Sequence, residues 1–277
     1  MGWNWIHSLV FGFISGFTEF LPVSADAHRN LFSCVTGVGS ELLGFRLVCH
    51  ISVLMVLFLS CRPQLSRLSR EHRIASTFAK RRRRQPDKLA LMDLKVLRTA
   101  AIPMLLAFIL FAKTQQLTQK LWVLALFWAL NGLILFLPQF FRSGNKSSQG
   151  MSALDSVLIG LGGALGVIPG ISRIGVLISC GRIRGGDGRY TVDIALLLCI
   201  PALIFLICYD IYAIYIAKSV LSFALLLYYL LAAVAACAGA YFGILLLRFL
   251  AVKTGFSGFA YYCWGAALLT FALYLTI

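Results

Sequence analysis

The sequence has few charged residues, and acidic residues are the scarcer kind. Asp, Glu, Lys and Arg make up 13% of the 277 residues, whereas hydrophobic residues make up 60%. An ordinary soluble domain has about 25% charged and about 45–50% apolar residues. Too few charges are therefore present to cover a water-exposed surface. The composition excludes an ordinary soluble domain and indicates an integral membrane protein.

Paired cysteines and common ligand-binding motifs are also missing. The eight cysteines lie singly, mostly in apolar runs, with no CxxC pair. This spacing argues against disulfides or a zinc site and favours small buried hydrophobic residues. No GxxxxGK[ST] phosphate-binding loop is present. A cleavable signal peptide is not expected, because the first apolar stretch lacks a basic start and contains His7 and Glu19.

Six apolar runs are long enough to cross a membrane as helices, and charged or turn-forming residues bound each of them. They are residues 43–61, 98–113, 120–141, 192–216, 219–247 and 256–277. The second run is short, because Arg98 and Lys113 enclose it. The sequence therefore predicts an all-α fold, a polytopic helix bundle that forms a single integral membrane domain over residues 1–277.

Two further apolar stretches, 3–22 and 154–178, are interrupted. Each contains glycine and reaches a Pro followed closely by Ser, in LPVS at 21–24 and IPGIS at 168–172. Irregular backbone at membrane depth survives only where it lines protein or a wet cavity. Interrupted segments in corresponding halves of a chain are typical of re-entrant helix hairpins. We expect one such hairpin in each half.

The order of these segments indicates an inverted repeat. Three of the six candidate spans follow each interrupted segment, and an odd number of crossings reverses the second copy relative to the first. The halves would be roughly 1–141 and 150–277, with the two hairpins meeting near the middle of the membrane. Transporters also use this architecture.

Most of the excess positive charge lies between residues 62 and 98. The chain has 25 Lys and Arg against 10 Asp and Glu, a formal charge of +15, and this stretch carries +9 of it. A short loop this basic is predicted to stay in the cytoplasm by the positive-inside rule. Attraction to anionic lipid is the functional alternative. Nucleic-acid binding is not expected, because neither base-stacking aromatics nor a folded binding module accompanies the charges.

Ionisable groups inside apolar segments are costly, so each is a candidate functional residue. The richest group, Glu19, Asp26, His28 and Arg29, surrounds Pro22 and Ser24 at the first interruption. A turn beyond Pro22 would bring these side chains together. A carboxylate, a hydroxyl and an imidazole in one pocket can bind a metal, transfer a proton or hold phosphate oxygens. The alternative is a hairpin whose polar groups satisfy one another.

The second interruption, PGISRIG at 169–175, favours an anion site. Glycine leaves backbone N–H groups approachable, and the guanidinium of Arg173 offers a fork of donors that suits phosphate oxygens. Asp193 and Asp210 lie in or near a span, and each is a candidate for pairing with a basic residue.

With these motifs the chain resembles the undecaprenyl-diphosphate phosphatase family, which are membrane enzymes of the bacitracin-resistance type. The first family signature, [EQ]xxxEFLP[IV]SSTGH, is similar to SGFTEFLPVSADAH at 15–28, and the second, PGxSRSG, to PGISRIG at 169–175. Order, spacing and flanking spans match over nearly the whole chain. The resemblance implies a helix bundle with two re-entrant hairpins in inverted halves.

The resemblance also implies an activity and a location. The reaction would be hydrolysis of undecaprenyl diphosphate to undecaprenyl phosphate and phosphate in the inner (plasma) membrane of a bacterial cell. This reaction recycles the lipid carrier for peptidoglycan and cell-wall synthesis, and it is linked to cell shape and antibiotic resistance. The partners would be the polyprenyl diphosphate lipid and the membrane, and a homodimer is left open.

Roles follow from the matching positions. Glu19 would bind a divalent cation, Mg²⁺ or Ca²⁺, or act as a base, and His28 would handle a proton. The diphosphate would be held by Ser172, Arg173, Gly170 and Gly175. Phosphoryl transfer consists mainly of positioning and charge neutralisation, so this set is chemically reasonable.

Several positions depart from the signatures. Ser15 stands where the family has its first carboxylate, and Ala25 stands where it has the second Ser. Asp26-Ala27 replaces Thr-Gly, and Ile174 replaces Ser. Ser24 is the candidate to replace the missing hydroxyl, and Asp26 the candidate second metal ligand beside Glu19.

Three functions stay open on the sequence. The first is a working phosphatase that uses Glu19, Ser24, His28 and Arg173. The second is a carrier or flippase of lipid phosphate on the same scaffold, and the third is an inactive relative that binds the lipid headgroup. Fold does not separate them, because function resides in the site.

Overall fold

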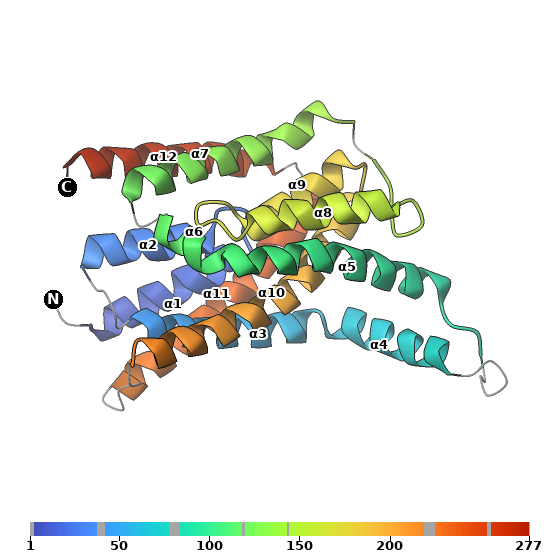
Figure 1. Ribbon diagram of the computed structural model, residues 1–277, viewed down its shortest axis with the longest axis horizontal. Coiled ribbons are helices and arrows are strands. Elements are labelled where there is room, and N and C mark those ends of the chain that lie inside the picture. The colour runs from blue at the N-terminus through green and yellow to red at the C-terminus, as the bar shows by residue number, and fades with distance from the viewer. Residues whose placement is uncertain are drawn as a thin grey trace.

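The computed structural model describes residues 3–37, 42–77, 84–117, 120–142, 144–218, 225–253 and 256–276. These residues form twelve α-helices and two 3-10 turns (Figure 1). The first half contains α1 (Trp5–Glu19), α2 (Ala25–Thr36), α3 (Leu42–Ser60), α4 (Arg62–Ser76), α5 (Lys88–Ala107), α6 (Phe111–Leu117) and α7 (Leu121–Phe136). The second half contains α8 (Ala153–Leu165), α9 (Arg173–Ile183), α10 (Gly188–Ile216), α11 (Leu226–Lys253) and α12 (Ser257–Thr276).

Six helical segments within the described residues are long and apolar enough to cross a membrane, which confirms the predicted helix bundle. They are Leu43–Ser60, Lys88–Gln116, Leu121–Phe140, Gly188–Ile216, Leu226–Ala251 and Ser257–Thr276. The parts of the predicted runs at 219–224 and 277 lie outside the described residues. The chain is a multi-pass membrane protein.

The prediction that 62–98 is a loop was wrong for most of its length. Residues 62–76 form α4, and α5 begins already at Lys88, where the Asp87 side chain accepts a hydrogen bond from the Leu89 backbone N–H. The second span is therefore longer than predicted, because Lys88, Lys95 and Arg98 in its first turns are exposed while Ala90, Asp93 and Val96 pack inward. Residues 78–83, which include most of the Arg run, lie outside the described part.

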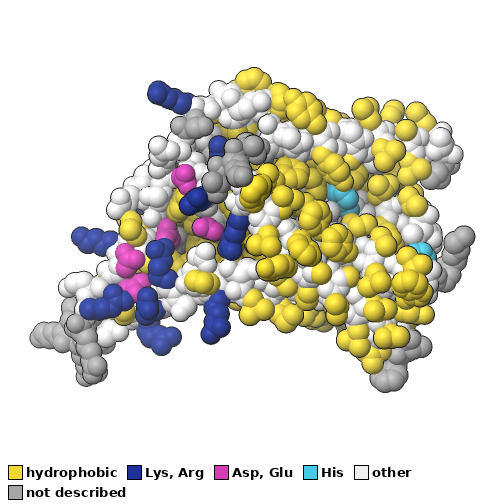
Figure 2. All heavy atoms as spheres, turned by 180° about the vertical axis from the view of Figure 1, so that it is seen from behind, with side chains coloured by type: hydrophobic (Ala, Val, Ile, Leu, Met, Phe, Trp, Pro, Cys, Tyr) yellow, Lys and Arg dark blue, Asp and Glu magenta, His cyan; other side chains and the backbone are white. Residues whose placement is uncertain are grey.

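The charged side chains gather at one end of the molecule, and the rest of the visible face is largely hydrophobic (Figure 2). This end carries α4 and the start of α5, where Arg67 pairs with Asp93 and Arg84 pairs with Glu71. Such a division suits a protein whose apolar belt faces lipid and whose charged end faces water.

Two helix–turn–helix hairpins occupy the interrupted stretches. Their helices, α1, α2, α8 and α9, have 15, 12, 13 and 11 residues. At 1.5 Å per residue the longest extends about 22 Å, less than the roughly 30 Å of a hydrocarbon core. The hairpins approach each other from opposite ends and their turns lie in the middle of the molecule (Figure 1). Re-entry into a membrane stays a prediction.

Contacts between helices follow one pattern in both halves. Helix α1 packs against α11, and its counterpart α8 packs against α5, the counterpart of α11. In the same way α3 packs against α11, and its counterpart α10 packs against α5. The pairs α7–α12 and α3–α10 join corresponding helices of the two halves. These contacts are those expected of two halves related by a two-fold axis; their opposite orientation across a membrane stays a prediction.

Small residues permit the closest of these approaches. A Cβ on Gly12 or Gly16 of α1 would overlap the backbone carbonyl of Ala232 or Ala236 in α11. Gly160 of α8 makes the corresponding close approach to α5. Helices in membranes associate through such small-residue faces, because lipid supplies no hydrophobic drive between them.

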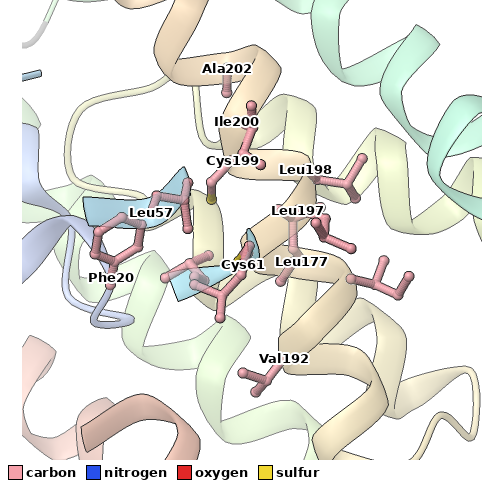
Figure 3. Close-up of a cluster of buried hydrophobic side chains, with 14 of the residues drawn as sticks. Phe20, Leu57, Cys61, Leu177, Val192, Leu197, Leu198, Cys199, Ile200 and Ala202 are labelled. Atoms are coloured by element: carbon pink, nitrogen blue, oxygen red, sulfur yellow. The ribbon is translucent and has the colours of Figure 1, made fainter. Parts of the chain in front are cut away.

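The largest buried cluster fixes the first hairpin turn against the spans (Figure 3). Phe20 of the α1–α2 turn is fully buried in one cluster with Leu57 of α3, Cys61 between α3 and α4, and Cys199 of α10. All eight cysteines lie in the described part of the chain as free thiols, four of them buried. The core therefore anchors the turn from which the candidate site is built.

Candidate functional site

The turn of the first hairpin holds Ser24 in an unusual backbone conformation. Helix α1 ends at Glu19, and the chain turns through Pro22 to Ser24, whose φ is 67° and ψ 99°. A non-glycine residue with positive φ is strained and persists only where its surroundings fix it. Here the Ser24 hydroxyl accepts a hydrogen bond from the Gly170 backbone N–H at 3.0 Å. The second hairpin therefore helps to hold this turn.

The turn of the second hairpin is built around Gly170 and Ser172. Gly170 has φ +103°, and a Cβ there would lie 2.7 Å from the Cβ of Phe127. The Ser172 hydroxyl caps α9 by accepting from the Gly175 N–H at 3.2 Å, and it donates to the Leu21 carbonyl at 3.1 Å. Of the predicted phosphate-holding groups, Gly170 and Ser172 thus join the two hairpins, whereas the Gly175 N–H is bonded within the second hairpin.

A buried amide in the middle of α7 links both turns. The Asn131 side-chain NH₂ donates to the Pro22 carbonyl at 3.0 Å, and its oxygen accepts from the Ser172 backbone N–H at 2.9 Å. Trp128, one helical turn earlier, donates its indole N–H to the Val23 carbonyl at 2.8 Å. Sequence reasoning missed Asn131, although an amide inside an apolar span is itself a signal.

Four charged side chains meet where the hairpin ends converge. Arg173, the first residue of α9, lies 3.2 Å from Glu19, the last residue of α1. Arg29 of α2 lies 2.7 Å from Asp26 and 3.4 Å from the other oxygen of Glu19. Each side chain is at most 15% exposed. The four formal charges cancel, as burial requires.

A small polar pocket opens beside this charged cluster. It has a volume of about 20 Å³, and its wall is formed by Thr18, Glu19, Ser24, Ala25, Asp26, Gly166, Ile171, Ser172 and Arg173. This space is about that of one water molecule. The guanidinium of Arg173 lies above the Phe108 ring at 5.6 Å, and its Nε is buried without a hydrogen-bond partner. A donor group is therefore available beside the pocket.

A much larger apolar groove adjoins the polar pocket. Its volume is about 640 Å³, and it is lined by Phe13, Ile14, Phe17, Thr18, Leu21, Val23, His28, Leu246, Leu250, Gly258, Phe259 and Tyr262. Thr18 contributes to both walls. The combination of a polar pocket and an apolar groove matches an amphiphile with an anionic head and a long hydrocarbon tail.

His28 lies in the groove wall and not in the polar pocket. Its Nδ1 is 2.8 Å from the Ser24 carbonyl and its Nε2 is 2.7 Å from the Tyr262 hydroxyl. A carbonyl only accepts, so Nδ1 carries the proton, and in the neutral ring Nε2 accepts from Tyr262. The structure thus brings Glu19, Ser24, Asp26 and Arg173 together and places His28 on the far side of Ser24.

The divalent cation expected from the resemblance does not fit the carboxylates as they are placed. Both oxygens of Glu19 and one oxygen of Asp26 already face guanidinium donors. Among the residues that the structure describes, no group of three or more His, Cys, Asp or Glu side chains is placed to hold a metal ion. Mg²⁺ and Ca²⁺ bind proteins mainly through carboxylate oxygens, and arginine already pairs with three of the four oxygens that Glu19 and Asp26 offer. Arg29, which sequence reasoning named without a role, takes part of the space.

A second buried ion cluster lies between α3 and α10. Asp210 lies 2.6 Å from Arg46 and 2.6 Å from His50, and it is 1% exposed. Asp193 lies 3.8 Å from Arg248. The two aspartates therefore pair with basic residues, and neither lines the polar pocket.

Comparison with known proteins adds a family. A family model described as bacitracin resistance protein BacA matches residues 8–269. An undecaprenyl-diphosphatase of Methanobrevibacter smithii is 29% identical over 278 residues, 96% of each chain. Undecaprenyl-diphosphatase 1 of Shouchella clausii is 30% identical over 202 residues, 72% of this chain and 71% of that protein. An undecaprenyl-diphosphatase of Nocardioides sp. is 29% identical over 205 residues, 73% and 72% of the two chains.

Proposed function

Because the chain belongs to the bacitracin resistance protein BacA family, we propose that it hydrolyses undecaprenyl diphosphate to undecaprenyl phosphate and phosphate. The relatives named above are undecaprenyl-diphosphatases. The observation that carries the proposal is the polar pocket that adjoins an apolar groove, with Thr18 in both walls. The diphosphate would enter the pocket and the prenyl chain would lie in the groove. This reaction returns the lipid carrier to cell-wall synthesis.

Arg173 is the residue that grips the diphosphate. Its free Nε donor lies beside the pocket, and its Nη1 donates to Glu19. The entering phosphate displaces Glu19 from the guanidinium of Arg173. A doubly charged phosphate is the stronger partner, because it can accept two parallel hydrogen bonds from the guanidinium. This exchange leaves an oxygen of Glu19 free to accept a proton.

Ser24 is the proposed nucleophile. Its oxygen attacks the terminal phosphorus while Glu19 takes the hydroxyl proton, and the bond from that phosphorus to the bridging oxygen breaks. Undecaprenyl phosphate leaves with the bridging oxygen. Water then attacks the phosphoserine, phosphate departs, Glu19 returns its proton to the Ser24 oxygen, and the second proton of water is released. His28 positions this serine through its hydrogen bond to the Ser24 carbonyl.

The test is phosphate release from undecaprenyl diphosphate by purified protein in detergent. We expect Glu19→Ala and Arg173→Ala each to lower release by about 100-fold or more, which is what removing a general base or a transition-state donor usually costs. Asp193→Asn is the matched control, because it removes a carboxylate outside the pocket, and it should retain release. A wild-type protein that binds the lipid without releasing phosphate would refute hydrolysis. Leaflet exchange of undecaprenyl phosphate in proteoliposomes would then test the carrier alternative.

We also propose that the protein lies in the plasma membrane with its basic end in the cytoplasm. The test is labelling of Gln85→Cys near that end and Val35→Cys near the far end of α2, with the native Cys34 and Cys208 replaced by Ser. An impermeant maleimide should reach Val35→Cys from outside and Gln85→Cys only after the membrane is opened. Outside labelling of Gln85→Cys would overturn the orientation. Association into a homodimer stays a prediction, which light scattering of the purified protein would check.

A further inference from the structure

Arg29 contacts both pocket carboxylates without lining the pocket itself. It donates to Asp26 at 2.7 Å and to Glu19 at 3.4 Å, and it is 6% exposed. It is not part of the pocket wall, whereas both carboxylates are. A single guanidinium therefore bridges two carboxylates, and its fork geometry suits that arrangement.

This bridge occupies the position in which a cation would act. A divalent cation shared by Glu19 and Asp26 would neutralise their charge and fix their orientation, and Arg29 does both. Adding such an ion beside Arg29 would place two positive groups together in a buried site, where little solvent screens their repulsion. Among the described residues, both oxygens of Glu19 and one oxygen of Asp26 contact a guanidinium, which leaves the second oxygen of Asp26 without one.

We propose that Arg29 is a built-in replacement for a divalent cation, so that this protein works without Mg²⁺ or Ca²⁺. Arg29 is a positioning residue, since it acts on the substrate through Glu19 and Asp26. Only the expected effect of Arg29 on turnover rests on the proposed hydrolysis. The expected effect of Arg29 on cation binding does not depend on any reaction.

The first test measures cation binding directly. Purified protein in detergent is dialysed against ⁴⁵Ca²⁺, and Mn²⁺ binding is followed by electron paramagnetic resonance. We expect the wild type to show no Ca²⁺ or Mn²⁺ binding that the substitution Glu19→Gln would abolish. The variant Arg29→Met should bind one cation at least tenfold more tightly, and Arg29→Met with Glu19→Gln should lose that binding. Arg46→Met is the matched control, because it uncovers the single carboxylate Asp210 and should gain no site.

The second test measures phosphate release with and without EDTA. Wild type and Arg29→Lys, which keeps the positive charge, should be unaffected by the chelator, whereas release by Arg29→Met should fall at least tenfold. Wild-type Ca²⁺ or Mn²⁺ binding that Glu19→Gln abolishes would overturn the proposal, even if hydrolysis is confirmed. A folded Arg29→Met protein that gains no cation site would also overturn it. If Arg29→Met does not fold, the wild-type dialysis and EDTA results decide. Failure of the wild type to release phosphate counts against the proposed hydrolysis alone.

Discussion

The substitution Asn131→Leu tests whether one amide holds the two hairpin turns together. Leu has the same number of side-chain heavy atoms as Asn, branched at the same carbon, but has no polar atom, so the change removes the hydrogen bonds without opening a cavity. Asn131 is fully buried, and its loss leaves the Ser172 N–H without its partner. The Pro22 carbonyl keeps only the weak Cys263 thiol at 3.8 Å.

The expected cost follows from these two backbone groups. A buried donor or acceptor without a partner costs about 1–3 kcal/mol. Polar contacts between membrane helices average nearer 0.6 kcal/mol, because the unfolded chain in a membrane also finds partners. We therefore take the low end, about 2 kcal/mol for the pair. For a chain of this size that lowers the melting temperature by roughly 4–8 °C.

The assay is thermal unfolding of the purified protein in detergent, followed by phosphate release at a temperature where both proteins are folded. Because Ser172 precedes Arg173, release should fall by up to about 100-fold, the cost of roughly 1 Å of misplacement. Thr270→Val is the control, since the Thr270 hydroxyl is equally buried but bonds only to its own helix at Ala266. An Asn131→Leu protein as stable and active as that control would refute the reasoning.

Three further outcomes are expected. Gly16→Leu should force α1 away from α11 and lower the melting temperature, because overpacking costs about 1–3 kcal/mol, whereas Gly265→Ala, where nothing lies within 4 Å, should leave it unchanged or raise it. Asp210→Asn should destabilise the protein by about 3–5 kcal/mol in thermal unfolding, and adding Arg46→Met should recover part of that loss. Burial raises the pKa of Asp155, but hydrogen bonds from the Ser152 N–H and from Arg184 outweigh burial and hold this pKa at about 2. The ionised Asp155 should therefore stabilise the start of α8 fully above about pH 4, and this stabilisation should be lost as the pH falls through about 2. Hydrogen exchange of the α8 backbone measures it.

The membrane spans were predictable because each is an apolar run whose minimum length is set by the thickness of the bilayer. The start of α5 was not, since a search that rejects charges ends a helix at Arg98, whereas the helix extends past the apolar layer to Lys88. Glu19 and Arg173 were predictable individually as charges in apolar segments. Their pairing depends on two turns meeting across 154 positions of the chain, and nothing local to either residue records that contact.

The same pairing makes the affinity of the site a difference between two interactions. The Nη1 of Arg173 must leave Glu19 before it can hold a phosphate, so the ion pair at 3.2 Å competes with the substrate. Glu19→Gln removes the competing charge and the proposed base together. We therefore expect the variant to bind undecaprenyl phosphate more tightly than wild type while its release of phosphate falls about 100-fold, near the low end of what general-base catalysis contributes. Lipid binding measured beside turnover separates the two effects. Weaker lipid binding by Glu19→Gln would mean that Glu19 helps to bind the phosphate headgroup. It would refute the proposal that Arg173 releases Glu19 in order to bind the phosphate.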